Sequence, residues 1–154
     1  MKLKKKAANE FFALAMATML GSGLFSSTVV ADGYSDAELE YYTDMLAHLI
    51  VGEVEGCDRE MKEYVGSVVL NRVESNKFPE SIEDVVFQEG QYSCTWDGNY
   101  YKTPSEEDYE IAKDLLENGS KLPEDVLFQA EFPQGEIYIS LLATNGVTEY
   151  FCYG

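Results

Sequence analysis

The chain has 154 residues, with 28 acidic and 11 basic side chains and a formal charge of −17. A length near 150 residues predicts a single domain. The negative charge excludes nucleic acid and anionic membranes as partners, because both are bound through clustered lysine and arginine side chains.

The first 31 residues are typical of a secretory signal peptide. Four lysines fall within the first six residues, ahead of an apolar stretch from Phe11 to Phe25 that is short for a membrane span of about 20 residues. We expect cleavage after Ala31, with an uncleaved anchor as the alternative. Residues 32–154 would then form a secreted domain without a membrane span, with 7 basic and 27 acidic side chains and a formal charge of −20.

Two long helices are predicted in the first half of this domain. Ser35 and Glu38 form a capping box, and apolar residues then recur three or four positions apart, which predicts a helix that runs to about Val54. Asp58 is the expected N-cap of a second helix, which ends around residues 75–76. Gly66 and Ser67 in this second helix leave room for a neighbouring segment to approach closely.

The second half combines shorter helices with strands. Residues 81–87 resemble a short capped helix, whereas residues 88–102 have no periodicity and are predicted to form a long loop. A capping box at Thr103, with proline next, predicts a helix that ends at Asn118 and Gly119. Three β-like segments follow, at residues 126–130, 137–139 and 149–153. The order of elements predicts an α+β domain with a small antiparallel sheet at its C-terminus.

Glu53 is the residue that departs from the pattern of its helix. It lies three positions after Ile50 and therefore falls on the apolar face. Loss of water and the negative end of the helix dipole both favour a protonated carboxyl group there, as a general acid needs. If the helix ended earlier, Glu53 would be an ordinary solvated acid. Glu55 is expected to face solvent.

The aromatic loop is the second candidate for function. Sugar rings stack on aromatic side chains, and carboxylate or amide groups bind their hydroxyl groups. The expected sugar-binding residues are Gln91, Tyr92, Trp96, Asp97 and Tyr100. In the alternative interpretation, the aromatic side chains only pin the loop to the core.

Three cysteines in a secreted chain suggest one disulfide and one free thiol. We predict a Cys94–Cys152 bond that fastens the loop to the last strand, although spacing alone allows three pairings. Cys57 would then stay reduced. A zinc site for amide hydrolysis is disfavoured, because such sites draw on several histidines and His48 is the only one in the sequence.

Several linked motifs resemble the spore cortex-lytic, SleB/CwlJ-type cell-wall hydrolases. The similar segments are residues 46–53 (LAHLIVGE), 65–73 (VGSVVLNRV), 78–79 (FP), 82–86 (IEDVV), 91–93 (QYS) and 96–98 (WDG). This resemblance covers about residues 39–116 and extends more loosely to residue 153. It implies a lysozyme-like or lytic-transglycosylase-like fold, with Glu53 as the catalytic acid/base and with no metal or cofactor. It also implies cleavage of peptidoglycan glycan strands next to muramic acid, outside the cytoplasm at the cell wall.

One departure from the family pattern bears on the mechanism. The family often has an arginine and a second glutamate where this chain has Glu55 and Cys57. A mechanism with one carboxylate is unaffected, so we expect a lytic transglycosylase that cleaves the β-1,4 bond after N-acetylmuramic acid. A muramidase with Asp97 or Glu89 as second carboxylate is an alternative. There are two further alternatives: an amidase built on Cys57 and His48, and a wall-binding module without catalysis.

Overall fold

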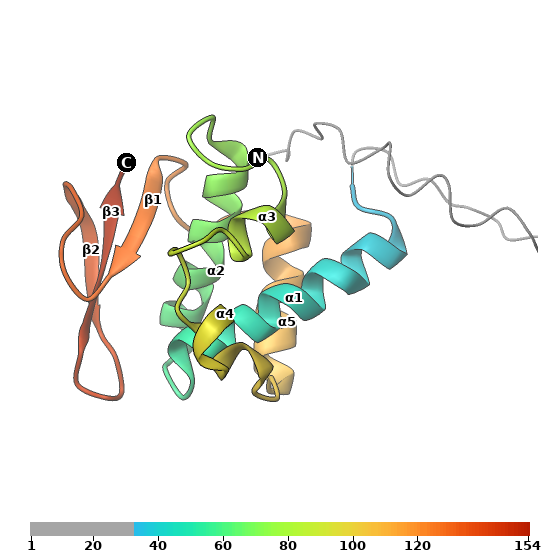
Figure 1. The fold of residues 1–154 in the computed structure, drawn as a ribbon, viewed down its shortest axis with the longest axis horizontal. Helices are drawn as coiled ribbons and strands as arrows, with labels where there is room; N and C mark the ends of the chain where they lie inside the picture. Colours follow the sequence, from blue (N-terminus) through green and yellow to red (C-terminus); the bar gives the residue numbers. More distant parts are fainter. Residues whose placement is uncertain (1–32) are drawn as a thin grey trace, which may run out of the picture.

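The computed structural model describes residues 33–154, so the predicted signal peptide lies outside the described residues (Figure 1). None of the helices in this described part is long and apolar enough to cross a membrane. The elements, in chain order, are α1 (Asp36–Val54), α2 (Arg59–Glu74), α3 (Ile82–Val86), α4 (Cys94–Asp97), the 3-10 helix η2 (Asn99–Tyr101), α5 (Glu106–Asn118), β1 (Val126–Ala130), β2 (Ile137–Leu142) and β3 (Thr148–Tyr153).

The helix starts follow their capping residues. The predicted N-caps Ser35 and Asp58 are confirmed, because each side chain accepts a hydrogen bond from a backbone N–H in the first turn. The prediction of Thr103 as the cap of α5 is wrong. The cap is Ser105, whose hydroxyl accepts from the Asp108 N–H while the Asp108 carboxylate accepts from the Ser105 N–H.

The segment predicted as a loop contains two short helices. Within residues 88–102, α4 and η2 together occupy seven positions, and Gly98 separates them with a φ of 94°. That left-handed conformation suits glycine, which has no Cβ. Because a four-residue helix is barely one turn long, it shows no 3.6-residue periodicity in the sequence.

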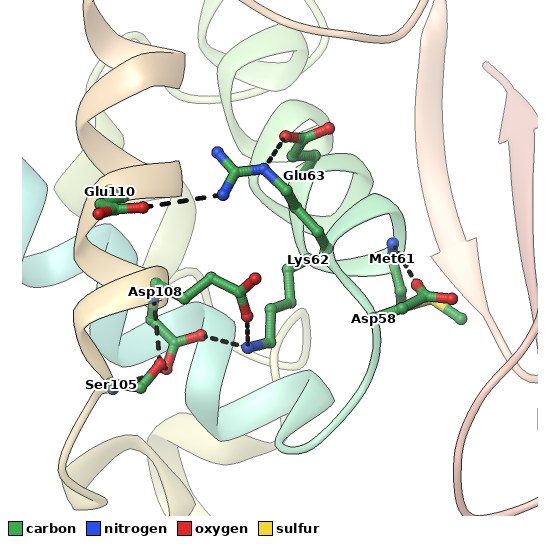
Figure 2. Close-up of polar contacts among 9 residues, drawn as sticks. Asp58, Met61, Lys62, Glu63, Ser105, Asp108 and Glu110 are labelled. Carbon is green, nitrogen blue, oxygen red and sulfur yellow. Dashed lines mark hydrogen bonds and ion pairs between the residues drawn. The ribbon is translucent and has the colours of Figure 1, made fainter.

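The helices α2 and α5 pack closely through small residues and a buried ion pair. A Cβ on Gly66 would lie 2.5 Å from Leu115 Cδ1, which confirms the predicted close approach of a neighbouring segment. The Lys62 ammonium of α2 lies 3.0 Å from Asp108 and 2.8 Å from Glu107, both on α5 (Figure 2).

The three strands form one antiparallel sheet in the order β1-β3-β2, beside α2 (Figure 1). The ring of Phe151 on the central strand is fully buried and packs edge-on against Tyr64 of α2, with the two ring centroids 5.4 Å apart. Two buried polar residues of α2 hold the chain that enters the sheet. The Asn71 amide donates to the carbonyls of Pro123 and Val126, and Arg72 Nε donates to that of Leu127 at 2.8 Å.

The predicted fold class is confirmed, with helices first and a small antiparallel sheet last. Strand β1 has the predicted bounds, whereas β2 extends to Leu142 and β3 begins at Thr148. The extra residues of β2 pair with the start of β3, with Leu142 opposite Thr148. Such pairing depends on the partner strand, so the sequence of either strand alone does not reveal it.

Candidate functional site

Glu53 lies in the last turn of α1 and is partly buried. Because α1 continues to Val54, the alternative in which the helix ends before Glu53 is excluded. The backbone N–H of Cys94, the first residue of α4, donates to Glu53 Oε1 at 3.2 Å. The carboxyl group is therefore held between the end of α1 and the segment that carries the aromatic residues.

Cys94 packs directly against α1 beside this carboxyl group. Its side chain is 1% exposed, and burial together with the nearby Glu53 carboxylate raises the pKa of the thiol. The thiol therefore stays protonated at neutral pH, and it is not a ready nucleophile.

Tyr92, an expected sugar-binding residue, is in the core. It is fully buried, and its ring lies 5.1 Å from the guanidinium carbon of Arg72. Burial raises the pKa of Tyr92 to about 12, the Arg72 charge opposes this rise, and the Glu53 charge adds to it. Tyr92 is thus a core residue that is close enough to Glu53 for the two side chains to interact electrostatically.

Tyr100 is also largely interior, at 9% exposure. Its carbonyl accepts a 2.7 Å hydrogen bond from His48 Nδ1, and its hydroxyl donates to the Met45 carbonyl at 3.4 Å. These contacts fasten the aromatic segment to α1. For Tyr92 and Tyr100, the structure therefore favours the alternative in which aromatic residues pin this segment to the core.

The other three expected sugar-binding residues are on the surface. Gln91, Trp96 and Asp97 are exposed, and Trp96 has 60% of its surface accessible. The Asp97 carboxylate accepts hydrogen bonds from the backbone and side-chain nitrogens of Asn99 at 2.8 and 2.9 Å. Trp96 and Asp97 belong to the same short helix as Cys94, so they lie close to Glu53.

The predicted Cys94–Cys152 disulfide is absent, because all three cysteines of the described chain are free. Cys94 faces α1, whereas Cys152 is buried in the central strand opposite Phe128 and Ile137. The two thiols thus belong to different packing layers.

The alternative nucleophile pair of Cys57 and His48 is not assembled either. The Cys57 thiol lies 3.7 Å from Thr144 Oγ1, in the turn before β3, whereas His48 Nδ1 is bound to the Tyr100 carbonyl. Nε2 of His48 is 3.9 Å from Asp44. The structure therefore gives the two side chains different partners.

Glu149 is a residue near the site that the sequence did not indicate. It lies on β3, two positions before the buried Phe151, so strand alternation turns both side chains toward the helices. It is partly buried, and burial together with the charges of Glu131 and Glu53 raises the pKa of its carboxyl group. The available signal was its two-residue spacing from Phe151. By contrast, Glu89, a predicted second carboxylate, is exposed.

A separate hollow of about 780 Å³ lies between α1 and α5. Its lining includes Tyr41, Asp44 and Tyr109, whose hydroxyl donates to Asp44 at 3.1 Å, but not Glu53 or Cys94. This hollow is therefore distinct from the Glu53 site. No group of three or more His, Cys, Asp or Glu side chains in residues 33–154 is placed to hold a metal ion.

Comparison with known proteins places the chain among cell-wall enzymes. The sequence model of a family described as Cell Wall Hydrolase matches residues 56–133, and Glu53 lies three residues before this match. The chain is 32% identical over 80 residues to a spore cortex-lytic enzyme of Halalkalibacterium halodurans. The aligned region covers 52% of this chain and 23% of that protein. It is also 30% identical over 96 residues to a spore cortex-lytic enzyme of Bacillus subtilis. That aligned region covers 62% of this chain and 30% of that protein. The chain therefore spans less than a third of either curated relative.

Two solved structures share the fold. The catalytic domain of the Bacillus cereus SleB protein matches with a TM-score of 0.60 and 24% identity, covering 81% of this chain and 96% of that one. The catalytic domain of a germination-specific lytic transglycosylase, SleB from Bacillus anthracis, matches with a TM-score of 0.58 and 23% identity, covering 80% and 99%. These similarities confirm the predicted lysozyme-like fold.

Proposed function

Because this chain belongs to the cell wall hydrolase family, we propose that it degrades peptidoglycan by cleaving its glycan strands. The bond cleaved is the β-1,4 linkage after N-acetylmuramic acid, and the reaction is that of a lytic transglycosylase. The observation that carries this proposal is the partly buried Glu53 carboxyl group, held by the Cys94 N–H at 3.2 Å. The exposed Trp96 on the same short helix supplies a stacking surface for a sugar ring.

A single carboxyl group suffices for this reaction. Glu53 donates its proton to the glycosidic oxygen as the bond from that oxygen to the muramyl anomeric carbon breaks. The resulting carboxylate then accepts the proton of the muramyl 6-hydroxyl, whose oxygen bonds to the same anomeric carbon. An anhydro-muramyl end forms, Glu53 regains its proton, and no water is consumed.

Glu149 supports a muramidase as the second candidate function. Retaining and inverting glycosidases both use two carboxyl groups on either side of the bond that is cleaved. Glu149 is a partly buried carboxyl group that interacts electrostatically with Glu53. In a muramidase, the oxygen of a water molecule would end on the anomeric carbon instead of the 6-hydroxyl oxygen.

The proposed place of action is outside the cytoplasm, at the cell wall, after removal of residues 1–31. Gln91, Trp96 and Asp97 would contact the glycan there, and no cofactor is required by the chemistry above. Intact-mass analysis of the secreted protein is expected to show a mature chain that begins at Asp32. Retention of the residues before Ala31 would contradict this.

The products of digestion in ¹⁸O-labelled water distinguish the two reactions. Peptidoglycan sacculi are incubated with the purified domain, and the released fragments are analysed by mass spectrometry. Unlabelled anhydro-muramyl ends are the expected result. Reducing ends that carry the heavy oxygen would overturn the transglycosylase proposal in favour of the muramidase, and the absence of any solubilisation would favour a binding module.

The substitution Glu53→Gln tests the role of the carboxyl group. The amide keeps the size of the side chain but cannot donate or accept the reaction's proton, so we expect glycan cleavage to fall by about 10²–10⁴-fold. Glu55→Gln is the matched control, because Glu55 is exposed and its carboxylate forms a surface ion pair with Lys102 at 2.7 Å. More than about a tenth of wild-type activity in Glu53→Gln, or loss of activity in the control, would contradict the assignment.

A further inference from the structure

We propose that Gly52 and Cys94 form a positioning contact that sets the Glu53 carboxyl group, with Gly52 as the residue that permits it. This inference rests on the proposed function, because it assigns Glu53 as the group to be positioned. The contact joins α1 to α4 at the residue next to Glu53. Neither Gly52 nor Cys94 takes part in the proposed reaction.

The distances around Gly52 show how close this contact is. A Cβ placed on Gly52 would lie 2.8 Å from Cys94 Cβ and 3.1 Å from its Sγ. It would also lie 3.3 Å from the backbone nitrogen of Tyr100. A side chain of any size at position 52 therefore requires the segment from Cys94 to Tyr100 to move away from α1.

The same approach creates the hydrogen bond to the carboxyl group. Cys94 N–H reaches Glu53 Oε1 at 3.2 Å, near the upper end of the usual range for such bonds. A shift of the segment by a few tenths of an ångström would therefore break it. Cys94 is 1% exposed and packs against α1, so its side chain cannot avoid the new methyl group by rotating into solvent.

The backbone of α1 around Gly52 gives no other reason for a glycine. Gly52 lies inside a regular helix, where glycine is less favourable than alanine by about 1 kcal/mol. Its φ is not in the left-handed region, unlike those of Gly56 and Gly98. The steric contact with Cys94 is thus the feature that requires the absence of a side chain.

We expect the substitution Gly52→Ala to lower kcat specifically. Displacement of Cys94 removes the hydrogen bond that orients the Glu53 carboxyl group, so kcat on peptidoglycan fragments should fall by about 10- to 100-fold. KM should change by less than about threefold, because a displacement of a few tenths of an ångström leaves the exposed Trp96 and Asp97 accessible to the glycan. A second substitution, Cys94→Gly, removes both atoms nearest to the new methyl group. The double variant should therefore recover most of the lost kcat.

Gly66→Ala is the matched control. A Cβ there would meet Leu115 at 2.5 Å, so this variant is also strained, but in the contact between α2 and α5. It should lower the melting temperature and leave kcat unchanged at a temperature where the protein is fully folded. Cys94→Val, which enlarges the other side of the contact, should lower kcat as Gly52→Ala does, and it serves as the test if Gly52→Ala does not fold.

The outcomes separate this inference from the proposed function. If Glu53→Gln is inactive while folded Gly52→Ala keeps full kcat, the positioning contact is refuted and the function stands. A loss in Gly52→Ala that Cys94→Gly does not restore would also refute it. If Glu53→Gln is active, the proposed function fails instead.

Discussion

At the scale of one residue, Tyr92 shows that an aromatic side chain of the segment near Glu53 belongs to the core. Its hydroxyl is buried without a hydrogen-bond partner among the described residues, and the Arg72 guanidinium lies over the ring, 5.1 Å from its centroid. The ring fills space in the core and receives the Arg72 guanidinium on its face. Its value to the fold therefore lies in the volume of the ring.

We expect Tyr92→Phe to change the free energy of unfolding by less than about 1 kcal/mol, because it removes only an unpaired hydroxyl. Tyr92→Ala should cost about 3–5 kcal/mol, because it leaves a cavity between Arg72 and the Glu53 region. Urea denaturation of the two variants measures both effects. Equal costs for the two substitutions would mean that the hydroxyl, not the ring, stabilises the fold.

At the scale of elements, α2 and α5 are joined by charges that are shielded from water. Burial opposes ionisation of Asp108, but the Ser105 N–H and hydroxyl and the Lys62 ammonium outweigh it and lower the pKa of Asp108. Burial of Lys62 acts against its charge, but Glu107 and Asp108 outweigh this and raise the pKa of Lys62 (Figure 2). The ionised pair is thus the favoured state across the neutral range.

The lowered pKa of Asp108 predicts acid sensitivity of the helix packing. The carboxyl group of an aspartate in the unfolded chain has a pKa of about 3.9, so the contribution of Asp108 is complete above about pH 5. It is lost as the pH falls through the lower value of the folded state. The free energy of unfolding should therefore decrease between about pH 5 and pH 3, and this decrease should be smaller in Asp108→Asn.

Lys62→Met should destabilise the protein at neutral pH. It leaves the Asp108 carboxylate buried with only its Ser105 hydrogen bonds, at a cost of about 2–3 kcal/mol. Lys113→Met is the control, because Lys113 is exposed and its pairing with Glu117 spans 3.9 Å. That exposed pair should contribute less than about 0.5 kcal/mol. Thermal melts of both variants provide the comparison, and similar losses would argue against a special role for the buried pair.

At the scale of the whole molecule, negative charge is the dominant feature. Residues 32–154 carry 27 acidic and 7 basic side chains, so the negative charges within the folded domain repel one another and destabilise it. Raising NaCl from about 10 to 200 mM shortens the Debye length from about 30 Å to below 10 Å. The free energy of unfolding in urea should rise by about 1 kcal/mol over this range. No change, or a decrease, would show that local ion pairs outweigh the net repulsion.

The sequence by itself determined the local structure. The caps Ser35 and Asp58, the strand β1 and the α+β order of elements depend on side chains a few positions apart, which form turns and hydrogen bonds with their own backbone. The predictions from sequence that were wrong also concerned local structure. The cap of α5 shifted to Ser105, and α4 was too short to show periodicity.

Only the tertiary structure decided which side chains meet around Glu53. Tyr92 is turned inward and Trp96 outward, although both are aromatic residues of one aperiodic segment. Glu149 on the last strand interacts electrostatically with Glu53. The Cys94 N–H donates to Glu53 from 41 residues away, and the Cys94 thiol is free instead of bonded to Cys152. Such contacts join distant segments, and their geometry follows from how helices and sheet pack against each other. Local periodicity carries no record of that packing, so it singled out Glu53 on the apolar face of its helix but not the hydrogen bond and the buried side chains around it.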